Sequence, residues 1–268
     1  MSLLFRYSQL YTISSSFAIL GILKYERRCL VQVIHKHSNS PLVISIPHSG
    51  TDIPQDIAPL CNRASKHEHT DWALTELVAS LLETTLVATI SRYIVDVNRF
   101  KPRNGKATQP IIPRIDEKGN PLFYNYPSKQ KQADWLEWYY TPYYSHLEKL
   151  LHQKLEHHSK VLLIDLHSYD DKLFQTSDII LGTRKKQTIS EDVLEQLQTL
   201  FHEEGFSTRV DTPFSGGNII ATFGKHPSIE AVQIEIPYSL YLEGHSLHTE
   251  RFTTLQKQLQ RIFQKVRM

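Results

Sequence analysis

The chain has 268 residues with 30 basic and 28 acidic side chains, so its formal charge is only +2. This balance gives no electrostatic case for nucleic-acid binding, and a hydrophobic content of 40% is typical of a folded globular protein rather than a disordered or fibrous one. Two cysteines cannot build a disulfide framework or a cysteine-based zinc site. A metal would therefore be held by some of the 14 histidines together with carboxylates.

Residues 1–27 are interpreted as an N-terminal extension of uncertain role. The apolar run Phe17–Leu23 is much shorter than the roughly 20 apolar residues that span a bilayer. The segment also lacks the continuous apolar stretch and small-residue cleavage site of a secretory signal. We therefore expect no membrane association and a cytoplasmic location, and we assign residues 28–268 to a single catalytic domain.

Strand and helix patterns alternate along the rest of the chain. The expected strands are Leu30–His35, Leu42–Ile46, Thr85–Ile90, Tyr93–Val97, Val161–Leu166, Ile179–Leu181, Phe206–Val210, Asn218–Phe223 and Ala231–Ile236. The expected helices are Asp71–Leu82, Ala133–His157, Ser190–Glu204 and His248–Val266, with a long functional loop over Arg99–Tyr126. The interleaving predicts an α/β fold with a mixed, mostly parallel central sheet flanked by helices.

Polar side chains follow or interrupt the aliphatic strands, which is where open α/β sheets bind ligands. His48 and His167 come at strand ends, and Glu235 interrupts the apolar run Val232–Ile236. A fourth group lies in SRYIVDVNRF and comprises Arg92, Asp96, Asn98 and Arg99. Each residue alone is explained as well by packing or turn chemistry. Together, two imidazoles, a carboxylate and arginines suit hydrolysis by metal-activated water.

The ordered motifs resemble those of the N-formylglutamate amidohydrolase family and, more distantly, the zinc carboxypeptidase and aspartoacylase superfamily. The motifs are SIPHSG (45–50), HTDW (69–72), SRYIVDVNR (91–99), LLIDLHS (162–168), FSGGNIIATFG (214–224) and VQIEI (232–236). The resemblance runs from about residue 29 to the end of the chain. It implies a three-layer phosphorylase/hydrolase-like fold and one zinc ion per chain, although other divalent metals also suit such ligands. It further implies a small-molecule substrate, an acidic amino acid whose N-acyl (formyl) amide is hydrolysed.

The resemblance also implies a role for individual residues. The metal ligands are His48, Asp71 and His167. The catalytic residues are Glu235, as the general base, and Arg92, which polarises the substrate carbonyl. The substrate contacts are Asn98 and Arg99 for the α-carboxylate, together with Ser168, Gly216 and Gly217.

Two departures from the family pattern leave alternatives open. Position 51 is threonine where zinc carboxypeptidases carry a ligating glutamate, so the second ligand comes from elsewhere. Asp71 is preferred, with Glu68 and His69 in reserve and a helix-terminal carboxylate as its structural alternative. The expected helix after residue 133 reads Pro-Tyr-Tyr at 142–144 and lacks the family's arginine. A related zinc peptidase or deacylase with another substrate, or a non-catalytic binding protein on the same fold, therefore stays possible.

Overall fold

The computed structural model describes residues 31–34, 38–62, 70–101, 109–244 and 246–268. The N-terminal extension assigned to residues 1–27 lies outside these ranges. The two reserve ligands, Glu68 and His69, also lie outside them. Within the described ranges, no helix combines the length and the apolar character needed to cross a membrane.

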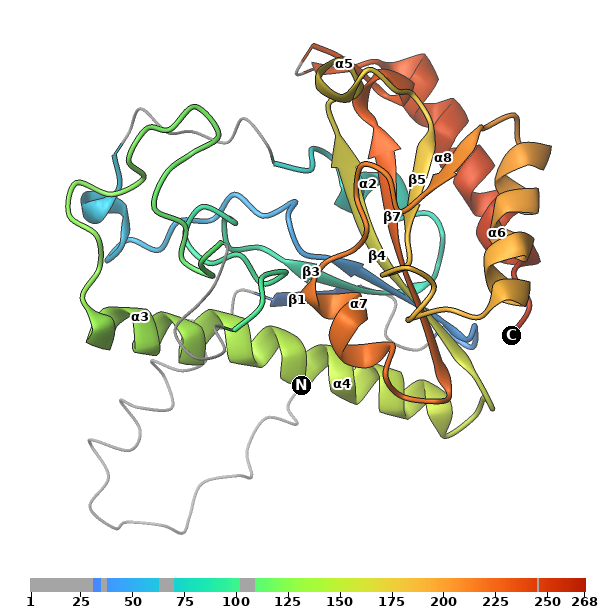
Figure 1. Ribbon diagram of the computed structural model, residues 1–268, viewed down its shortest axis with the longest axis horizontal. Helices are drawn as coiled ribbons and strands as arrows, with labels where there is room; N and C mark the ends of the chain where they lie inside the picture. Colours follow the sequence, from blue (N-terminus) through green and yellow to red (C-terminus); the bar gives the residue numbers. More distant parts are fainter. Residues whose placement is uncertain (1–30, 35–37, 63–69, 102–108, 245) are drawn as a thin grey trace, which may run out of the picture.

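A seven-stranded sheet forms the centre of the molecule, in the order β1-β3-β2-β4-β7-β5-β6 (Figure 1). Its strands are β1 (Val31–Ile34), β2 (Leu42–Ile46), β3 (Thr84–Ala88), β4 (Val161–Tyr169), β5 (Ile179–Gly182), β6 (Thr208–Val210) and β7 (Ile229–Pro237). The pairs β1–β3 and β5–β7 are antiparallel and the other four are parallel, which confirms the mixed, mostly parallel sheet. Strands β3, β2, β4 and β7 run the same way, so their carboxyl ends share one edge.

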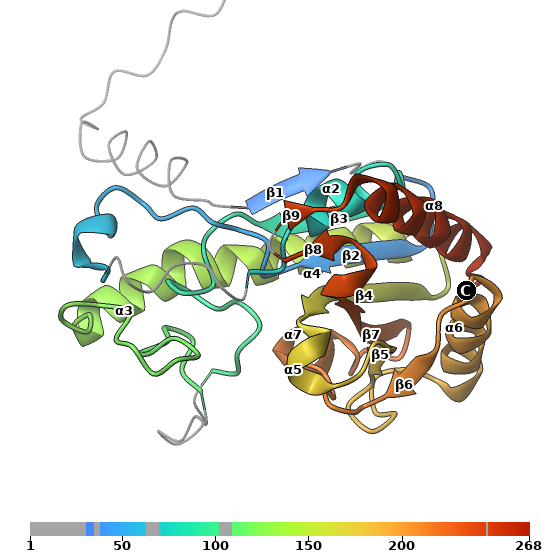
Figure 2. The same cartoon turned by 90° about the horizontal axis from the view of Figure 1, so that it is seen from above.

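Helices cover both faces of this sheet (Figure 2). One face carries α4 (Thr141–Leu155) and α7 (Asn218–Phe223), and α3 (Lys129–Trp135) leads into α4 through the π-helical turn η2 (Leu136–Tyr140). The other face carries α2 (Leu74–Val78), α6 (Glu191–Glu203) and α8 (Thr249–Lys265). The remaining short elements are η1 (Ala58–Leu60), α5 (Asp171–Phe174), η3 (Tyr238–Leu240), β8 (Leu242–Glu243) and β9 (Ser246–Leu247).

Side chains of the strands alternate between two hydrophobic clusters, one on each face. Leu162, Ile164 and Leu166 of β4 join the cluster that contains α2, α6 and α8. Val161 and Leu163 of the same strand join the cluster that contains α4 and α7. The sheet is therefore buried on both sides, as expected for parallel strands.

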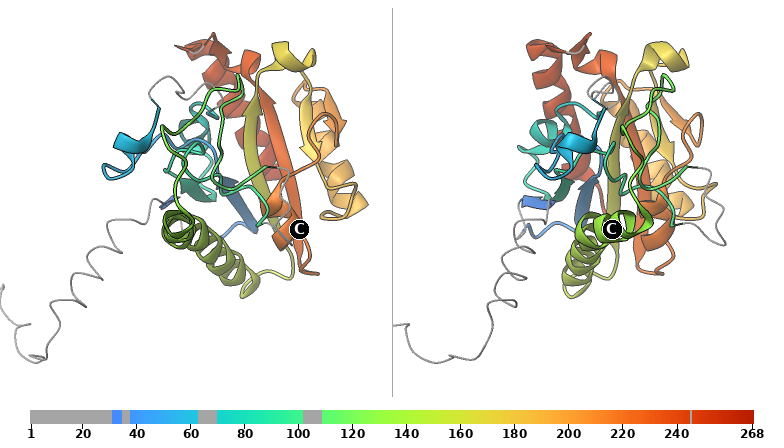
Figure 3. Two further views of the ribbon diagram at one scale, coloured as in Figure 1. Left: turned by 60° about the vertical axis from the view of Figure 1, so that its left-hand side comes forward. Right: turned by 90° about the vertical axis from the view of Figure 1, so that its left-hand side faces the viewer.

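A loop-rich region extends from the sheet beside α3 (Figure 3). Two segments far apart in sequence lie side by side there, because Cys61 and Phe123 form a bridge and Asn62 N donates to Leu122 O at 2.8 Å. The described parts of the expected loop Arg99–Tyr126 form no helix. Their β-type pairing consists of isolated bridges such as this one.

Three expected elements differ from the structure. The strand over Tyr93–Val97 is wrong: this segment forms turns, and its apolar side chains are buried in the core without strand pairing. The strand over Asn218–Phe223 is wrong because these residues form α7. The helix over Asp71–Leu82 is wrong in extent, because α2 comprises only Leu74–Val78: Ala73, with a φ of 55°, prevents an earlier start, and the chain after Val78 continues in turns.

Candidate metal centre and active site

The polar side chains of the sheet gather at the carboxyl ends of its central strands. The registers pair Ser45 of β2 with Asp165 of β4, and His167 of β4 with Glu235 of β7. Gln233 of β7 pairs with Asp165 in the same register. Paired residues of neighbouring strands point to the same face, here the face covered by α4 and α7. On that face, the strands begin with apolar side chains, and these polar side chains follow toward the carboxyl ends.

Three potential metal ligands meet at the end of this polar group, and His167 is one of them. His48, Asp71 and His167 each offer a ligand atom, and these atoms lie within 4.8 Å of one another. Asp71 Oδ2 is 3.0 Å from His167 Nδ1 and 3.8 Å from His48 Nδ1. The three residues are buried, with exposed fractions of 5%, 2% and 3% in that order. The structure thus brings together the three residues expected to hold a metal.

Asp71 reaches the cluster because its backbone is tied to the loop after β2. Its amide donates to the His48 carbonyl at 3.1 Å, and the Ser49 hydroxyl donates to the Asp71 carbonyl at 2.6 Å. These two bonds fix Asp71 beside His48 although 22 positions separate it from Ser49 along the chain. The positive φ of Ala73 then turns the chain into α2, so Asp71 precedes the helix instead of starting it.

Each histidine presents its other ring nitrogen to a carboxylate. His48 Nε2 is 2.7 Å from Asp96 Oδ1, and His167 Nε2 is 3.1 Å from Asp165 Oδ2. Such carboxylates fix the imidazole with its proton on Nε2 and leave Nδ1 available as a ligand. His48 Nδ1 is buried without a hydrogen-bond partner in the described part of the chain.

These observations fit a divalent cation of the zinc type. Ligands about 2 Å from a tetrahedral zinc ion lie about 3.3 Å from one another, and the ligand distances to Asp71 Oδ2 bracket that value. Two imidazoles and a carboxylate are ligands that zinc accepts while keeping a position open. His48, Asp71 and His167 would therefore hold the cation through Nδ1, Oδ2 and Nδ1.

Without a cation, the two imidazoles differ in charge. Burial lowers the pKa of His48 from its ordinary value, so this ring is neutral. Burial also opposes charging of His167, but the neighbouring carboxylates of Asp165, Asp71 and Glu235 outweigh it and raise its pKa well above the ordinary value. For Asp96, the hydrogen bond with His48 and the charges of Arg92 and Arg99 overcome the effect of burial and hold the pKa well below its usual range. A cation must accordingly displace one proton, that of His167.

Glu235 lies beside the cluster with a perturbed acidity. Burial, with a contribution from Asp71, raises the pKa of its carboxyl group to about 8. Its Oε1 accepts a hydrogen bond from Gln233 Nε2 at 2.7 Å, and Gln233 Oε1 accepts one from Gly217 N at 2.8 Å. The carboxyl group is thus oriented by its own strand and can exchange a proton near neutral pH.

The two arginines converge on Asp96. Arg92 Nη2 and Arg99 Nε lie 3.3 Å and 3.0 Å from Asp96 Oδ2. Their side chains are 18% and 36% exposed, so neither is fully buried. One carboxylate therefore holds His48 through one oxygen and both arginines through the other.

The Asn98 side chain is used inside the protein. Its Nδ2 donates to Asp165 Oδ2 at 2.8 Å and also lies 2.9 Å from His167 Nε2, and its Oδ1 accepts from Ile219 N at 3.0 Å. A methyl group at Gly217 would overlap this amide, so the Gly217 backbone can lie against Asn98 only because it lacks a side chain. Gly216 has φ +104°, a conformation that also favours glycine.

Ser168 is not brought to this cluster. Strand alternation places its side chain on the face opposite His167, where Ser168 is buried. Its assignment to substrate binding stays a prediction.

Sequence reasoning missed three residues that support the cluster. Asp165 and Gln233 precede His167 and Glu235 by two positions, and this period of two within an aliphatic strand is the signal that could have identified them. Asp96 has no such signal, because nothing in the sequence links it to His48 at a separation of 48 residues.

Comparison with known proteins assigns the chain to a family. The family model described as N-formylglutamate amidohydrolase matches residues 40–242. The chain belongs to this family. It is 30% identical over 227 residues to the N-formylglutamate deformylase of Pseudomonas aeruginosa, covering 78% of this chain and 84% of that protein.

Two solved structures share the fold. The N-formylglutamate amidohydrolase of Ralstonia eutropha superposes with a TM-score of 0.74 at 24% identity, covering 88% of this chain and 96% of the other. A protein of Agrobacterium tumefaciens superposes with a TM-score of 0.69 at 15% identity, covering 90% and 96%. Family membership and the buried ligand cluster support a hydrolase that acts on amide bonds.

Proposed function

We propose that this chain is a metal-dependent N-formylglutamate amidohydrolase that releases the formyl group from an acidic amino acid by hydrolysis. The single observation that carries the proposal is the convergence of His48, Asp71 and His167, with Glu235 beside them, in a chain of this family. The proposal includes a catalytic domain over residues 28–268 with a three-layer phosphorylase/hydrolase-like fold. Helices on both faces of the sheet support that fold assignment.

A divalent cation, with zinc as the first choice, would polarise the amide carbonyl and increase the acidity of water at this site. His48, Asp71 and His167 would hold it. Asp96 and Asp165 keep the two imidazoles in the tautomer that leaves Nδ1 unprotonated once His167 has lost its proton.

Glu235 is assigned the proton transfers. Its carboxylate would take a proton from the attacking water and pass it to the nitrogen of the leaving amino acid. A buried carboxyl group with a pKa of about 8 can gain and lose a proton readily near that pH. The hydrogen bond from Gln233 leaves the second carboxyl oxygen of Glu235 available for this exchange.

The arginines are assigned to the negative charges of the reaction. Arg92 would stabilise the oxygen that becomes an oxyanion, and Arg99 would bind the α-carboxylate of the substrate. Asn98, whose side chain is bonded to Asp165 and Ile219, would act with Arg99 mainly by fixing this loop. Gly216 and Gly217 would let the backbone approach the substrate closely.

The test is the variant Glu235→Gln, assayed for bound metal and for hydrolysis of N-formylglutamate. Loss of the proton acceptor should lower kcat by about 10²- to 10⁴-fold, while the metal content stays at the wild-type value. Glu243→Gln, an exposed glutamate in β8, is the matched control and should leave both unchanged. Full activity in Glu235→Gln would reject the assigned role. Failure of wild-type protein to hydrolyse any N-acyl amino acid in a panel would reject the proposed reaction.

A further inference from the structure

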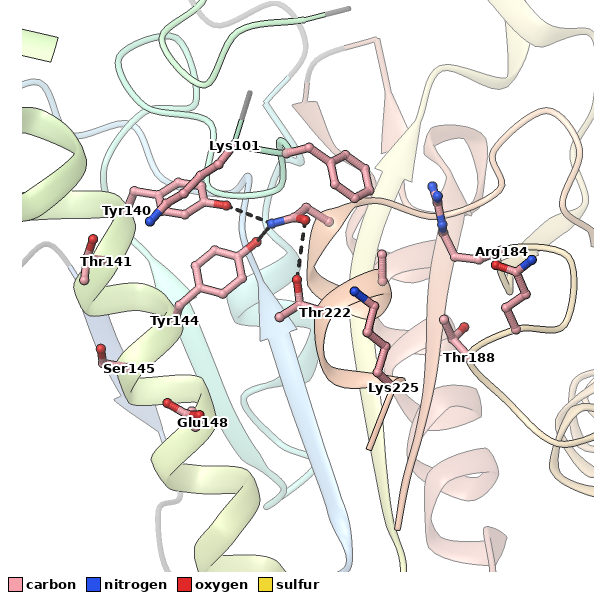
Figure 4. A pocket seen from close by; sticks show the side chains of 14 residues that line it. Lys101, Tyr140, Thr141, Tyr144, Ser145, Glu148, Arg184, Thr188, Thr222 and Lys225 are labelled. Atoms are coloured by element: carbon pink, nitrogen blue, oxygen red, sulfur yellow. Dashed lines mark hydrogen bonds between the residues drawn. The ribbon is translucent and has the colours of Figure 1, made fainter. Parts of the chain in front are cut away.

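A second group of charged side chains surrounds a pocket outside the metal centre (Figure 4). The pocket lies between α4, α7 and the loop that follows β5, and its volume of about 730 Å³ is in the range of small-molecule sites. Its charged lining residues are three cations, Lys101, Arg184 and Lys225, and one acid, Glu148. The pocket is therefore electropositive.

Within the described parts of the chain, none of the three cations forms an ion pair with a carboxylate. Arg184 Nη1 donates to the Gly216 carbonyl at 3.1 Å, and its guanidinium lies 5.2 Å from the ring centre of Phe100. Lys101 Nζ lies 5.1 Å from the ring centre of Tyr140. Neighbouring cations without acidic partners repel one another, and an anion would remove this repulsion.

Arg184 is held in position by a strained turn. Arg184, Lys185 and Lys186 have φ values of 53°, 60° and 60°, a left-handed conformation that costs roughly 1 kcal/mol or more per residue without glycine. Asp211 stabilises the turn by accepting hydrogen bonds from the amides of Thr183 and Lys185 at 2.6 Å and 2.9 Å. Strain of this kind persists where surrounding contacts enforce it and is concentrated at functional sites.

The wall toward the metal centre is closed by hydrogen bonds between its own groups. Asn218 Nδ2 donates to the hydroxyls of Tyr140 and Tyr144 at 2.8 Å and 2.6 Å, and Asn218 N donates to the Asn98 carbonyl at 3.2 Å. The Tyr140 hydroxyl in turn donates to the Arg99 carbonyl at 3.0 Å. A ligand in the pocket must therefore find its partners among the cations and hydroxyls of the outer wall.

We propose that this pocket binds a small organic molecule with two or more negative charges, at a site separate from the metal centre. Figure 4 shows Lys101 beside Tyr140 on the α4 side of the pocket, across from Arg184, with Lys225 between them, so the negative groups should be spread between the two sides. A ligand with one charge would leave two of the three cations uncompensated. Dicarboxylates and phosphate monoesters share the required chemistry.

The experiment measures binding of glutarate and of glucose 6-phosphate to the metal-loaded protein by calorimetry. The test variant is Lys101→Gln combined with Lys225→Gln, because neither lysine is assigned to the metal centre, to the proton transfers or to the substrate contacts. We expect saturable binding of at least one probe, and a rise in its dissociation constant of about tenfold or more in the double variant. Lys225→Arg should bind within about threefold of wild type, and Lys257→Gln, exposed on α8 at the opposite face, should bind as wild type.

Three results would overturn the proposal. The first is that neither probe binds saturably below about 10 mM. The second is that the double variant binds as tightly as wild type. The third is that the KM for N-formylglutamate rises in parallel with the dissociation constant of the probe, which would make the pocket part of the substrate site. An unchanged KM together with weakened probe binding supports a separate site.

Discussion

The two faces of β4 and β7 show how one pair of strands serves both stability and function. On the face toward α8, the middle of both strands is aliphatic: Leu162, Ile164 and Leu166 beside Val232, Ile234 and Ile236. On the face toward α4, the first positions are apolar and the last are Asp165 and His167 beside Gln233 and Glu235. Every one of these residues is buried. Burial alone therefore does not distinguish core from site; the distinction lies in the pairing of polar groups.

The largest effects are expected from alanine variants of the adjacent residues His167 and Leu166, which point to opposite faces of the sheet. His167→Ala removes a proposed metal ligand, so bound metal and hydrolysis of N-formylglutamate should both be lost, as measured by elemental analysis and by formate release. Because His167 is paired with carboxylates on both ring nitrogens, retention of wild-type activity would contradict its position in the metal centre.

Leu166→Ala should lower the stability of the protein and leave its metal content unchanged. Its side chain is fully buried on the α8 face, so truncation should cost about 2–5 kcal/mol of unfolding free energy. Metal content at a temperature where the variant is folded should equal that of wild type. Denaturant unfolding measures the first quantity. A metal loss comparable to that of His167→Ala would show that the two faces are not independent.

A smaller effect is expected at the support for His167. Asp165→Asn removes the charge opposite His167 Nε2 but keeps the shape of the side chain and its place beside Ser45 and Asn98. Metal affinity should fall about 10- to 100-fold. Competition with a fluorescent chelator gives the affinity, and Glu195→Gln, exposed on α6, serves as the control. An unchanged affinity would rule out the role given to Asp165.

The pH dependence of metal affinity distinguishes His167 from His48. In the metal-free protein the pKa of His167 is raised and that of His48 is lowered, so binding releases one proton at pH values below the His167 pKa. Metal affinity should therefore increase by about tenfold per pH unit as the pH rises toward that pKa. Chelator competition across a pH series checks the slope. A slope of zero between pH 6 and about pH 7 would mean that His167 is already neutral.

The sequence predicts the centre of the fold well because β2, β4 and β7 are short aliphatic runs, typical of strands buried on both faces. It fails at Asn218–Phe223, where a short apolar run is compatible with either a strand or a buried helix, and the structure has α7. It fails at Tyr93–Val97, where the apolar side chains are buried but the backbone has no strand partner.

The candidate site is predictable only in part, for a similar reason. His167 and Glu235 are marked by their position in strands whose ends coincide. Asp96 is not, because its contact with His48 depends on how two loops meet. The family resemblance supplied Asp71, and its backbone bonds to His48 and Ser49 explain how it comes to lie between the two imidazoles.

The most direct test is the metal content of purified wild-type protein and of Asp71→Ala, measured by mass spectrometry after dialysis and alongside hydrolysis of N-formylglutamate. The structure predicts about one divalent cation per wild-type chain, a large loss of that cation in Asp71→Ala, and a matching loss of activity. A wild-type protein that hydrolyses the substrate without any bound cation, or an Asp71→Ala variant with full occupancy, would contradict a metal centre built from His48, Asp71 and His167.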